Sequence, residues 1–260
     1  MPRLRRISAA SLPALLTSAA LSVSAVSQQP SQTAPPDVPA SWLSTVQQNI
    51  AESEYHVTWQ DHTLLQDVAA AYQAPNRAQN LRTYFTPDGI RVVPRDVARD
   101  ETPAWEWGLS FVGCGAKTVG SMTRPTPCVE GNRVEYDHGN VVEWYVNDAR
   151  GLEQGFTVAK RQNVETPKSQ KEELRVNFAI TGNVTAALAD NSAAVDFLAP
   201  GGARAIRFAN LHAIDATGRS LPTRFEVSVN PLSAIHNPQL LTLVVDDHNA
   251  IYPVVIDPPA

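Results

Sequence analysis

The stretch from Arg133 to Val158, RVEYDHGNVVEWYVNDARGLEQGFTV, decides the fold of this 260-residue chain. Polar and apolar side chains alternate on both sides of residues 138–140, which is typical of two strands joined by a β-hairpin. A three-residue loop at 138–140 gathers the apolar side chains, whereas a two-residue loop scatters apolar and charged groups over both faces. The expected apolar face holds Val134, Tyr136, Val142, Trp144 and Val146, and the other face holds Arg133, Glu135, Asp137, Glu143 and Tyr145.

This register makes Glu135 and Glu143 a candidate catalytic pair. It places them opposite each other, with their Cβ atoms about 4.5–5.5 Å apart. Retaining glycosidases use two carboxylates about 5 Å apart. Both acids are nevertheless expected on an open face beside Arg133, where water and the guanidinium relieve their repulsion. We therefore expect a hairpin with solvated charges and no catalytic residue.

Period-two alternation continues along most of the chain and predicts an all-β fold. Trp105, Trp107, Leu109 and Phe111 share one face, and the runs LRTYFT and IRVVPR flank a turn at residues 87–89. Many short strands separated by turn residues are typical of β-sandwich-like antiparallel sheets. One short helix is expected from Ser41 to about residue 53, where apolar residues recur every four positions. The polar segment 160–173 is either a long surface loop or a boundary between two β subdomains.

The N-terminal residues have the features of an export signal. A basic segment, MPRLRR, precedes an apolar run of small residues, and Val23-Ser24-Ala25 fits a small-x-small cleavage site. Pro13 and several serines interrupt the apolar run, which makes it a poor membrane span. Residues 1–25 are therefore predicted to be a signal peptide and residues 26–40 a flexible linker. A secreted or cell-surface module is expected at 41–258.

The charge balance narrows the expected partners. The sequence carries 21 basic and 26 acidic residues. Loss of residues 1–25 removes three arginines and no acid, so 18 basic residues remain and the net charge becomes −8. Nucleic acids and anionic membranes bind basic patches. We expect neither nucleic-acid binding nor membrane insertion after signal removal, and we expect an unidentified protein or glycan at the cell surface as the partner.

The two cysteines, Cys114 and Cys128, are predicted to form a disulfide. An exported chain meets an oxidising compartment, where two lone cysteines tend to pair. The bond would close a loop rich in Gly, Thr and Pro. Two free thiols are the alternative, and no third or fourth metal ligand stands nearby.

Other polar groupings are expected to be structural. His56 and His62, with Asp61 beside them, do not share a face of an extended segment, so no metal site is predicted. The run Asp246-Asp247-His248 resembles a catalytic-triad fragment, but successive strand residues point to opposite faces and favour a turn. Trp105 and Trp107 are expected in the core rather than in a sugar-stacking platform. The sequon at 183–185 fits a hairpin turn equally well. Cofactor-binding motifs are absent from the sequence.

Short motifs give the chain a family resemblance. YDHGNVVEWYV, AVDFLAPGGAR, the turn at 215–218 before RSLP, and YPVVIDP together span roughly residues 81–258. They resemble the N-terminal β-rich domain of uncharacterised large secreted bacterial proteins that carry SBBP-type or FG-GAP (integrin-like) repeats. The resemblance implies a β-rich module that further domains usually follow, and it implies no catalytic residues.

The first expectation is therefore a non-enzymatic extracellular β module with a structural, adhesive or partner-binding role. A carbohydrate-active enzyme or lectin that uses Glu135, Glu143 and exposed aromatic residues is the second. A third possibility is an N-terminal cap of a repeat array, since terminal repeats need a polar outer face.

Overall fold

The computed structural model describes residues 40–98, 101–115, 124–161, 173–229 and 239–257. The chain divides into two compact units, residues 1–43 and 44–260, and the sheets belong to the second. The predicted signal peptide and all of the linker except residue 40 lie outside the described residues. The helix expected from Ser41 is present as α1.

The elements are α1 (Ala40–Ser53), β1 (Thr58–Gln60), β2 (Ala71–Asn76), β3 (Leu81–Thr86), β4 (Gly89–Pro94), β5 (Trp107–Cys114), β6 (Cys128–Glu130), β7 (Arg133–Asp137), β8 (Val141–Asp148), β9 (Gly151–Val158), β10 (Leu174–Gly182), β11 (Thr185–Ala189), η1 (Asp190–Ser192), β12 (Ala194–Leu198), β13 (Arg204–Ala209), β14 (His212–Ile214), β15 (Ser220–Leu221), β16 (Thr223–Val229), β17 (Gln239–Val245) and β18 (Val254–Asp257).

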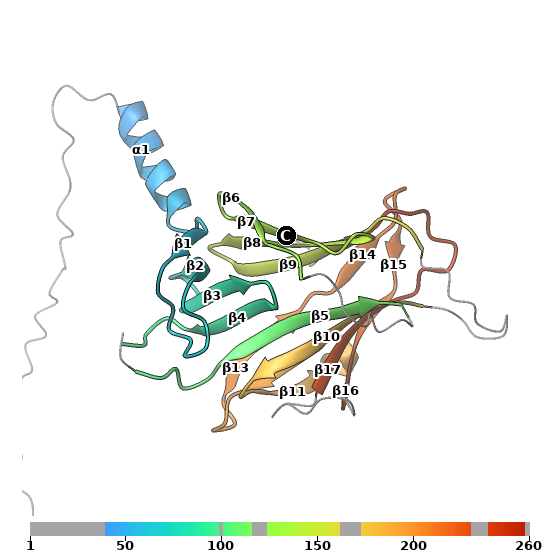
Figure 1. Cartoon of the computed structure of the whole chain (residues 1–260). Helices are drawn as coiled ribbons and strands as arrows, with labels where there is room; N and C mark the ends of the chain where they lie inside the picture. The colour runs from blue at the N-terminus through green and yellow to red at the C-terminus, as the bar shows by residue number, and fades with distance from the viewer. Residues whose placement is uncertain (1–39, 99–100, 116–123, 162–172, 230–238, 258–260) are drawn as a thin grey trace, which may run out of the picture. The chain divides into compact units, whose positions relative to one another are not determined.

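Within the described ranges the strands form three antiparallel sheets, which confirms the predicted all-β, sandwich-like class (Figure 1). Sheet A has the order β1-β2-β3-β4-β5-β10-β17-β16, and sheet B has the order β15-β14-β18-β9-β8-β7-β6. Sheet C is the small sheet β11-β12-β13. Each large sheet contains strands that precede segment 160–173 and strands that follow it. In sheet A, β5 pairs with the later strand β10, and in sheet B, β9 pairs with the later strand β18.

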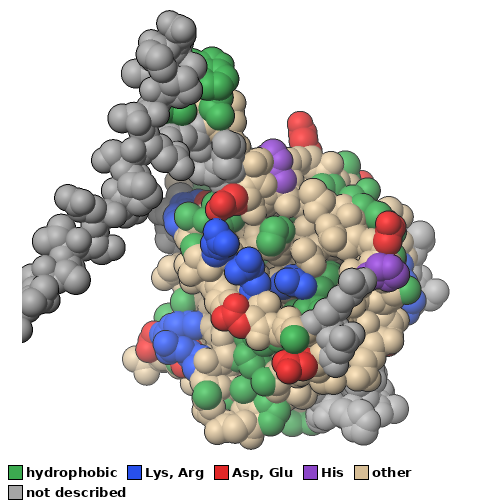
Figure 2. Space-filling view, turned by 90° about the vertical axis from the view of Figure 1, so that its left-hand side faces the viewer, with side chains coloured by type: hydrophobic (Ala, Val, Ile, Leu, Met, Phe, Trp, Pro, Cys, Tyr) green, Lys and Arg blue, Asp and Glu red, His purple; other side chains and the backbone are tan. Residues whose placement is uncertain are grey.

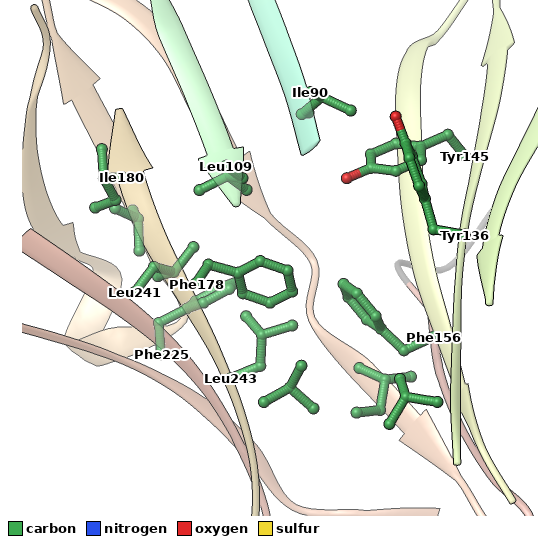
Figure 3. Packing of buried hydrophobic residues seen from close by; sticks show 14 of the residues in the cluster. Ile90, Leu109, Tyr136, Tyr145, Phe156, Phe178, Ile180, Phe225, Leu241 and Leu243 are labelled. Atoms are coloured by element: carbon green, nitrogen blue, oxygen red, sulfur yellow. The ribbon is translucent and has the colours of Figure 1, made fainter. Parts of the chain in front are cut away.

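The core lies between sheets A and B. Phe178 of sheet A points toward Phe156 of sheet B, and Tyr145 of sheet B points toward Ile90 of sheet A (Figure 3). The rings of Phe156 and Phe178 are 5.3 Å apart, centroid to centroid, and both side chains are almost fully buried. Burial of such apolar area is the main stabilising term of the fold.

Trp107, at the start of β5, and Trp105, just before that strand, take part in this core, as predicted. Trp107 is 5% exposed and contacts Phe197 of sheet C, with ring centroids 4.9 Å apart. Trp105 is partly buried against the same cluster. A β-bulge then interrupts the pairing of β5, because Phe111 faces Phe178 whereas Gly113 faces Asn177. The extra residue, Val112, leaves Cys114 on the inner face.

The hairpin of β7 and β8 has a different register from the one predicted. Tyr136 faces Glu143 and Glu135 faces Trp144. The His138 amide donates to the Val141 carbonyl at 2.9 Å, so the pairing has the register of a two-residue turn at 139–140 rather than of the expected three-residue loop. A shift of one residue exchanges the faces of β8. Glu143 and Tyr145 therefore point into the core, and Trp144 lies on the outer face of sheet B.

Two features favour this register. Trp144 lies flat against Gly155 of β9 and is covered by the Arg133 guanidinium, 4.7 Å from the ring centroid. The inner carboxylate of Glu143 finds hydrogen-bond partners inside the sandwich. Sequence patterning assumed that an acid faces water and an indole faces the core, and both residues reverse that assumption.

Polar side chains also connect the two large sheets. The Asn76 side-chain amide of β2 donates to the Asn147 side chain of β8 at 2.9 Å and to the backbone carbonyl of Asp148 at 2.7 Å. The Tyr136 hydroxyl of β7 donates to the Thr86 carbonyl at the end of β3, at 3.0 Å. These bonds satisfy groups that burial would otherwise leave unpaired.

Candidate functional site

A buried carboxylate, Glu143, forms the centre of the candidate site. It is 3% exposed. Its Oε1 atom accepts hydrogen bonds from the Tyr145 hydroxyl at 2.5 Å and from the Gln154 side-chain amide at 2.7 Å. Its Oε2 atom lies 3.0 Å from Nε2 of His138. A buried carboxylate is tolerated only when it is paired and hydrogen-bonded in this way.

The strands explain how these four side chains meet. Tyr145 and Gln154 face each other across β8 and β9, and both belong to the inner row of sheet B. His138 follows β7 in the hairpin loop, and its side chain is 6% exposed. Its ring stacks on Phe111 of sheet A with centroids 4.0 Å apart and planes 17° apart. The imidazole is thus held between a carboxylate of one sheet and an aromatic ring of the other.

The tyrosines beside Glu143 stay protonated. Burial raises the pKa of Tyr145 and of Tyr136 well above the usual tyrosine range, and the negative charge of Glu143 adds to the effect. Both hydroxyls are therefore hydrogen-bond donors at any ordinary pH. Gln154 donates to the Tyr145 hydroxyl as well, at 2.7 Å, which closes the network.

The cluster opens onto a groove of about 1040 Å³, called the rim groove here. Phe111, His138 and Glu143 lie at its inner end, whereas Arg91, Ser110 and Ala179 line its course over the outer face of sheet A. The β3–β4 turn lies between these two parts of the lining. The groove mixes apolar and polar groups, as ligand sites usually do.

Ion pairs stiffen the outer part of the rim groove. The Arg91 Nε atom lies 2.5 Å from Glu106, and its Nη1 atom lies 2.6 Å from Asp67. These contacts lower the pKa of the Asp67 carboxyl and raise that of the Arg91 guanidinium further above its usual range. Across the turn, Arg124 pairs with Asp88 at 2.6 Å between two exposed side chains.

The structure does not bring the two candidate catalytic acids together. Glu135 lies on the outer face of sheet B and accepts a hydrogen bond from Arg133 at 2.8 Å. Glu143 lies on the inner face, with both oxygens engaged. The geometry expected for a carboxylate pair is therefore wrong, since the register shift separates the two acids by the thickness of the sheet.

The structure does not show the predicted disulfide either. Cys114 is a buried free thiol and Cys128 is an exposed one. Cys114 points inward from β5 of sheet A, whereas Cys128 begins β6 at the edge of sheet B. Much of the loop that joins them, residues 116–123, lies outside the described residues.

The remaining candidates are arranged as turns and surface residues. His56 and His62 are exposed, and the described residues contain no group of three or more His, Cys, Asp or Glu side chains that could hold a metal. Asp247 is buried and accepts from the Tyr252 hydroxyl at 2.6 Å, while the neighbouring His248 is exposed in the turn. Asn183 is exposed and accepts from the backbone amide of Glu106.

His138, Tyr145 and Gln154 were not predicted as site residues. One signal for Gln154 was available, because it alternates with Leu152, Phe156 and Val158 and so stands alone as a polar residue in an apolar row. The contact between His138 and Phe111 joins two sheets and leaves no trace in local sequence.

No protein-family model, curated protein or solved structure matches the chain. Among the described residues, no helix has the length and apolar character needed to cross a membrane. The suspected family resemblance therefore stays a prediction.

Proposed function

We propose that this chain is a non-enzymatic extracellular β module that binds a partner, a protein or a glycan, through the rim groove. The observation that carries the proposal is the closed hydrogen-bond shell of Glu143 at the inner end of the groove. Three side chains occupy its oxygens, so the carboxylate is held as a fixed part of the wall rather than as a free acid or nucleophile.

The location outside the cell belongs to the same proposal. Its support is the basic and apolar N-terminal sequence with a small-x-small site ending at Ala25. The resemblance to N-terminal domains of secreted repeat proteins supports it as well, and a role as the cap of a repeat array is compatible with a binding groove.

The first experiment tests the absence of catalysis. The purified mature protein is expected to release no product from a panel of chromogenic α- and β-glycosides. Glu143→Gln preserves the volume of the side chain, and circular dichroism will report whether it folds. Turnover by the wild type that disappears in a folded Glu143→Gln protein would overturn the non-enzymatic proposal in favour of a carbohydrate-active enzyme.

The second experiment tests the groove. Ala179 lines the rim groove from β10, and Ala179→Arg fills that space with a long charged side chain. Ser228→Arg is the matched control, because Ser228 is exposed on β16 and does not line the groove. Binding to purified cell-envelope polysaccharides or surface proteins should fall at least tenfold in Ala179→Arg only. Equal binding by both variants would contradict the assignment.

A further inference from the structure

Arg82 and Arg95 differ from the other arginines of the described ranges. Each of the others forms an ion pair with an aspartate or glutamate. No such pair or side-chain hydrogen bond to a described residue is found for Arg82 or Arg95. In an acidic chain of net charge −5, two arginines without a carboxylate are an exception.

The two side chains lie next to each other on sheet A. Arg82 of β3 faces Val93 of β4, and just beyond the last ladder pair the Arg95 amide donates a single hydrogen bond to the Asn80 carbonyl at 2.9 Å. Arg82 and Arg95 are therefore diagonal neighbours on one face, with Cα atoms roughly 7–8 Å apart. It is the outer face, because Phe85 and Val92 on the opposite side belong to the core.

No carboxylate of the described residues neutralises these two cations. Nε of Arg82 is buried and has no hydrogen-bond partner among the described residues, an arrangement that burial normally penalises. Asp67 lies over the same strands, but Arg91 donates to both of its oxygens, at 2.8 and 2.6 Å. The two positive charges are therefore adjacent, and one of them, Arg82, has an unsatisfied donor of its own.

A third arginine lies in the turn that precedes β3. Arg77 has only a weak ion pair, 4.0 Å from Glu54 between two exposed side chains. Such a surface pair contributes little and leaves Arg77 available. Figure 2 shows Lys and Arg side chains gathered on the face of the molecule seen from the left of Figure 1, the side on which β1–β4 lie.

From these contacts we infer that Arg82 and Arg95 form a binding site for an oxyanion, a carboxylate, sulfate or phosphate group of an acidic ligand. A guanidinium presents paired N–H donors in a planar fork that fits two oxygens of such a group. An anion between the two arginines would relieve their repulsion and accept from the terminal Nη groups of the two guanidiniums, which form no side-chain hydrogen bond to a described residue. The site lies apart from the Glu143 cluster and does not depend on the function proposed for the rim groove.

The test follows the arginine side chains directly. The ¹⁵N-labelled mature protein is titrated with sodium sulfate, sodium phosphate and sodium acetate at constant ionic strength, and the arginine Nε–Hε signals are recorded by NMR. The Arg82 and Arg95 signals should shift and saturate, and the anion that saturates at the lowest concentration identifies the ligand chemistry. Arg82→Gln and Arg95→Gln should each lower the affinity for that anion at least tenfold.

Arg133→Gln is the matched control, because Arg133 is paired with Glu135 on sheet B, and it should leave binding unchanged. The inference is overturned if no anion gives a saturable shift, or if Arg133 and Arg224 shift as much as Arg82. If Arg82→Gln does not fold, the result for Arg95→Gln decides: unchanged anion binding by the folded Arg95→Gln protein is then enough to overturn the inference. Ala179→Arg should leave anion binding intact, which separates this test from that of the groove.

Discussion

At the scale of single residues, Glu143 shows how the interior of this sandwich accommodates a charge. Its oxygens accept from a hydroxyl and an amide and contact an imidazole, all contributed by sheet B. Phe156 lies opposite Glu143 in the ladder, and Val141 lies two residues before it on the same face. The arrangement stabilises the fold only while the donors and the acceptor are all present, because the removal of one partner leaves the others buried and unpaired.

Removal of the acceptor should therefore be more harmful than removal of its charge. Glu143→Ala leaves His138, Tyr145 and Gln154 without their common partner and is expected to lower the free energy of unfolding by about 3–5 kcal/mol. Glu143→Gln keeps an acceptor and the side-chain volume and should cost about 1–3 kcal/mol. Urea denaturation followed by tryptophan fluorescence measures both. Equal losses for the two variants would contradict the role of the network.

The two thiols should differ sharply in reactivity. Burial, with the nearby charge of Asp247, raises the pKa of Cys114 to about 12, so almost none of it is thiolate at neutral pH. In the reduced, folded protein, a maleimide should label the exposed Cys128 within minutes and Cys114 only in denaturant. Cys128→Ser is the control and should remain unlabelled. Failure of both cysteines to react in the unreduced, exported protein, even when unfolded, would instead indicate the disulfide predicted from sequence.

Glu153 should make stability fall as the pH rises. Burial, and then the neighbouring Asp257 carboxyl, raise its pKa to about 7 from an ordinary value of 4.5. The folded state therefore binds this proton more tightly than the unfolded state, so the contribution of Glu153 to stability is fully present below about pH 4.5 and is lost as the pH rises through about 7. We expect Glu153→Gln to be more stable than the wild type at pH 8 by about 1–3 kcal/mol, and about equal at pH 4.5.

The measurement is the difference in unfolding free energy between wild type and variant at each pH, which removes the contribution of groups that both proteins share. Glu130→Gln is the control, since Glu130 is an exposed acid on the edge strand β6 of the same sheet. A difference that does not change between pH 4.5 and pH 8 would disprove the role of Glu153.

At the scale of elements, β8 and β9 depend on the close contact between Trp144 and Gly155. A Cβ atom at position 155 would lie 2.0 Å from the indole, and the Arg133 guanidinium lies over the same ring, 4.7 Å from its centroid. Gly155→Ala should therefore destabilise the protein by about 1–3 kcal/mol through overpacking, and it should shift the Trp144 fluorescence. Gly201→Ala is the control, because a Cβ there meets no atom within 4 Å. It should stay within about 0.5 kcal/mol of the wild type.

The elements themselves were largely predictable, because strands and turns follow from local pattern. The hairpin of β3 and β4 around residues 87–89 and the buried row of β10 came directly from alternation and turn residues. The register of β7 and β8 did not, since it depends on Gly155 and Gln154 in the next strand. The rim groove could not be predicted either, because its lining comes from segments that are far apart in sequence and adjoin only after the sheets form.

At the scale of the whole molecule, one hydrophobic cluster joins both large sheets. It includes residues from Val57 to Ile256, and strands on either side of segment 160–173 contribute to it. These pairings favour one folding unit over two β subdomains. Urea unfolding monitored by far-UV circular dichroism and by tryptophan fluorescence should then give a single transition with coincident midpoints. Two separated transitions would indicate an internal boundary near residues 160–173.

The positions of β17 and β18 in the sheets also affect how the chain reaches its native state. β17 lies between β10 and β16, and β18 lies between β14 and β9, although both come late in the sequence. While the ribosome is still adding residues 239–257, neither large sheet can be completed, and the emerging polypeptide exposes unpaired strand edges. Pairing over so long a sequence separation is slow, so the nascent chain keeps these edges open to pairing with other chains until β17 and β18 have joined their sheets.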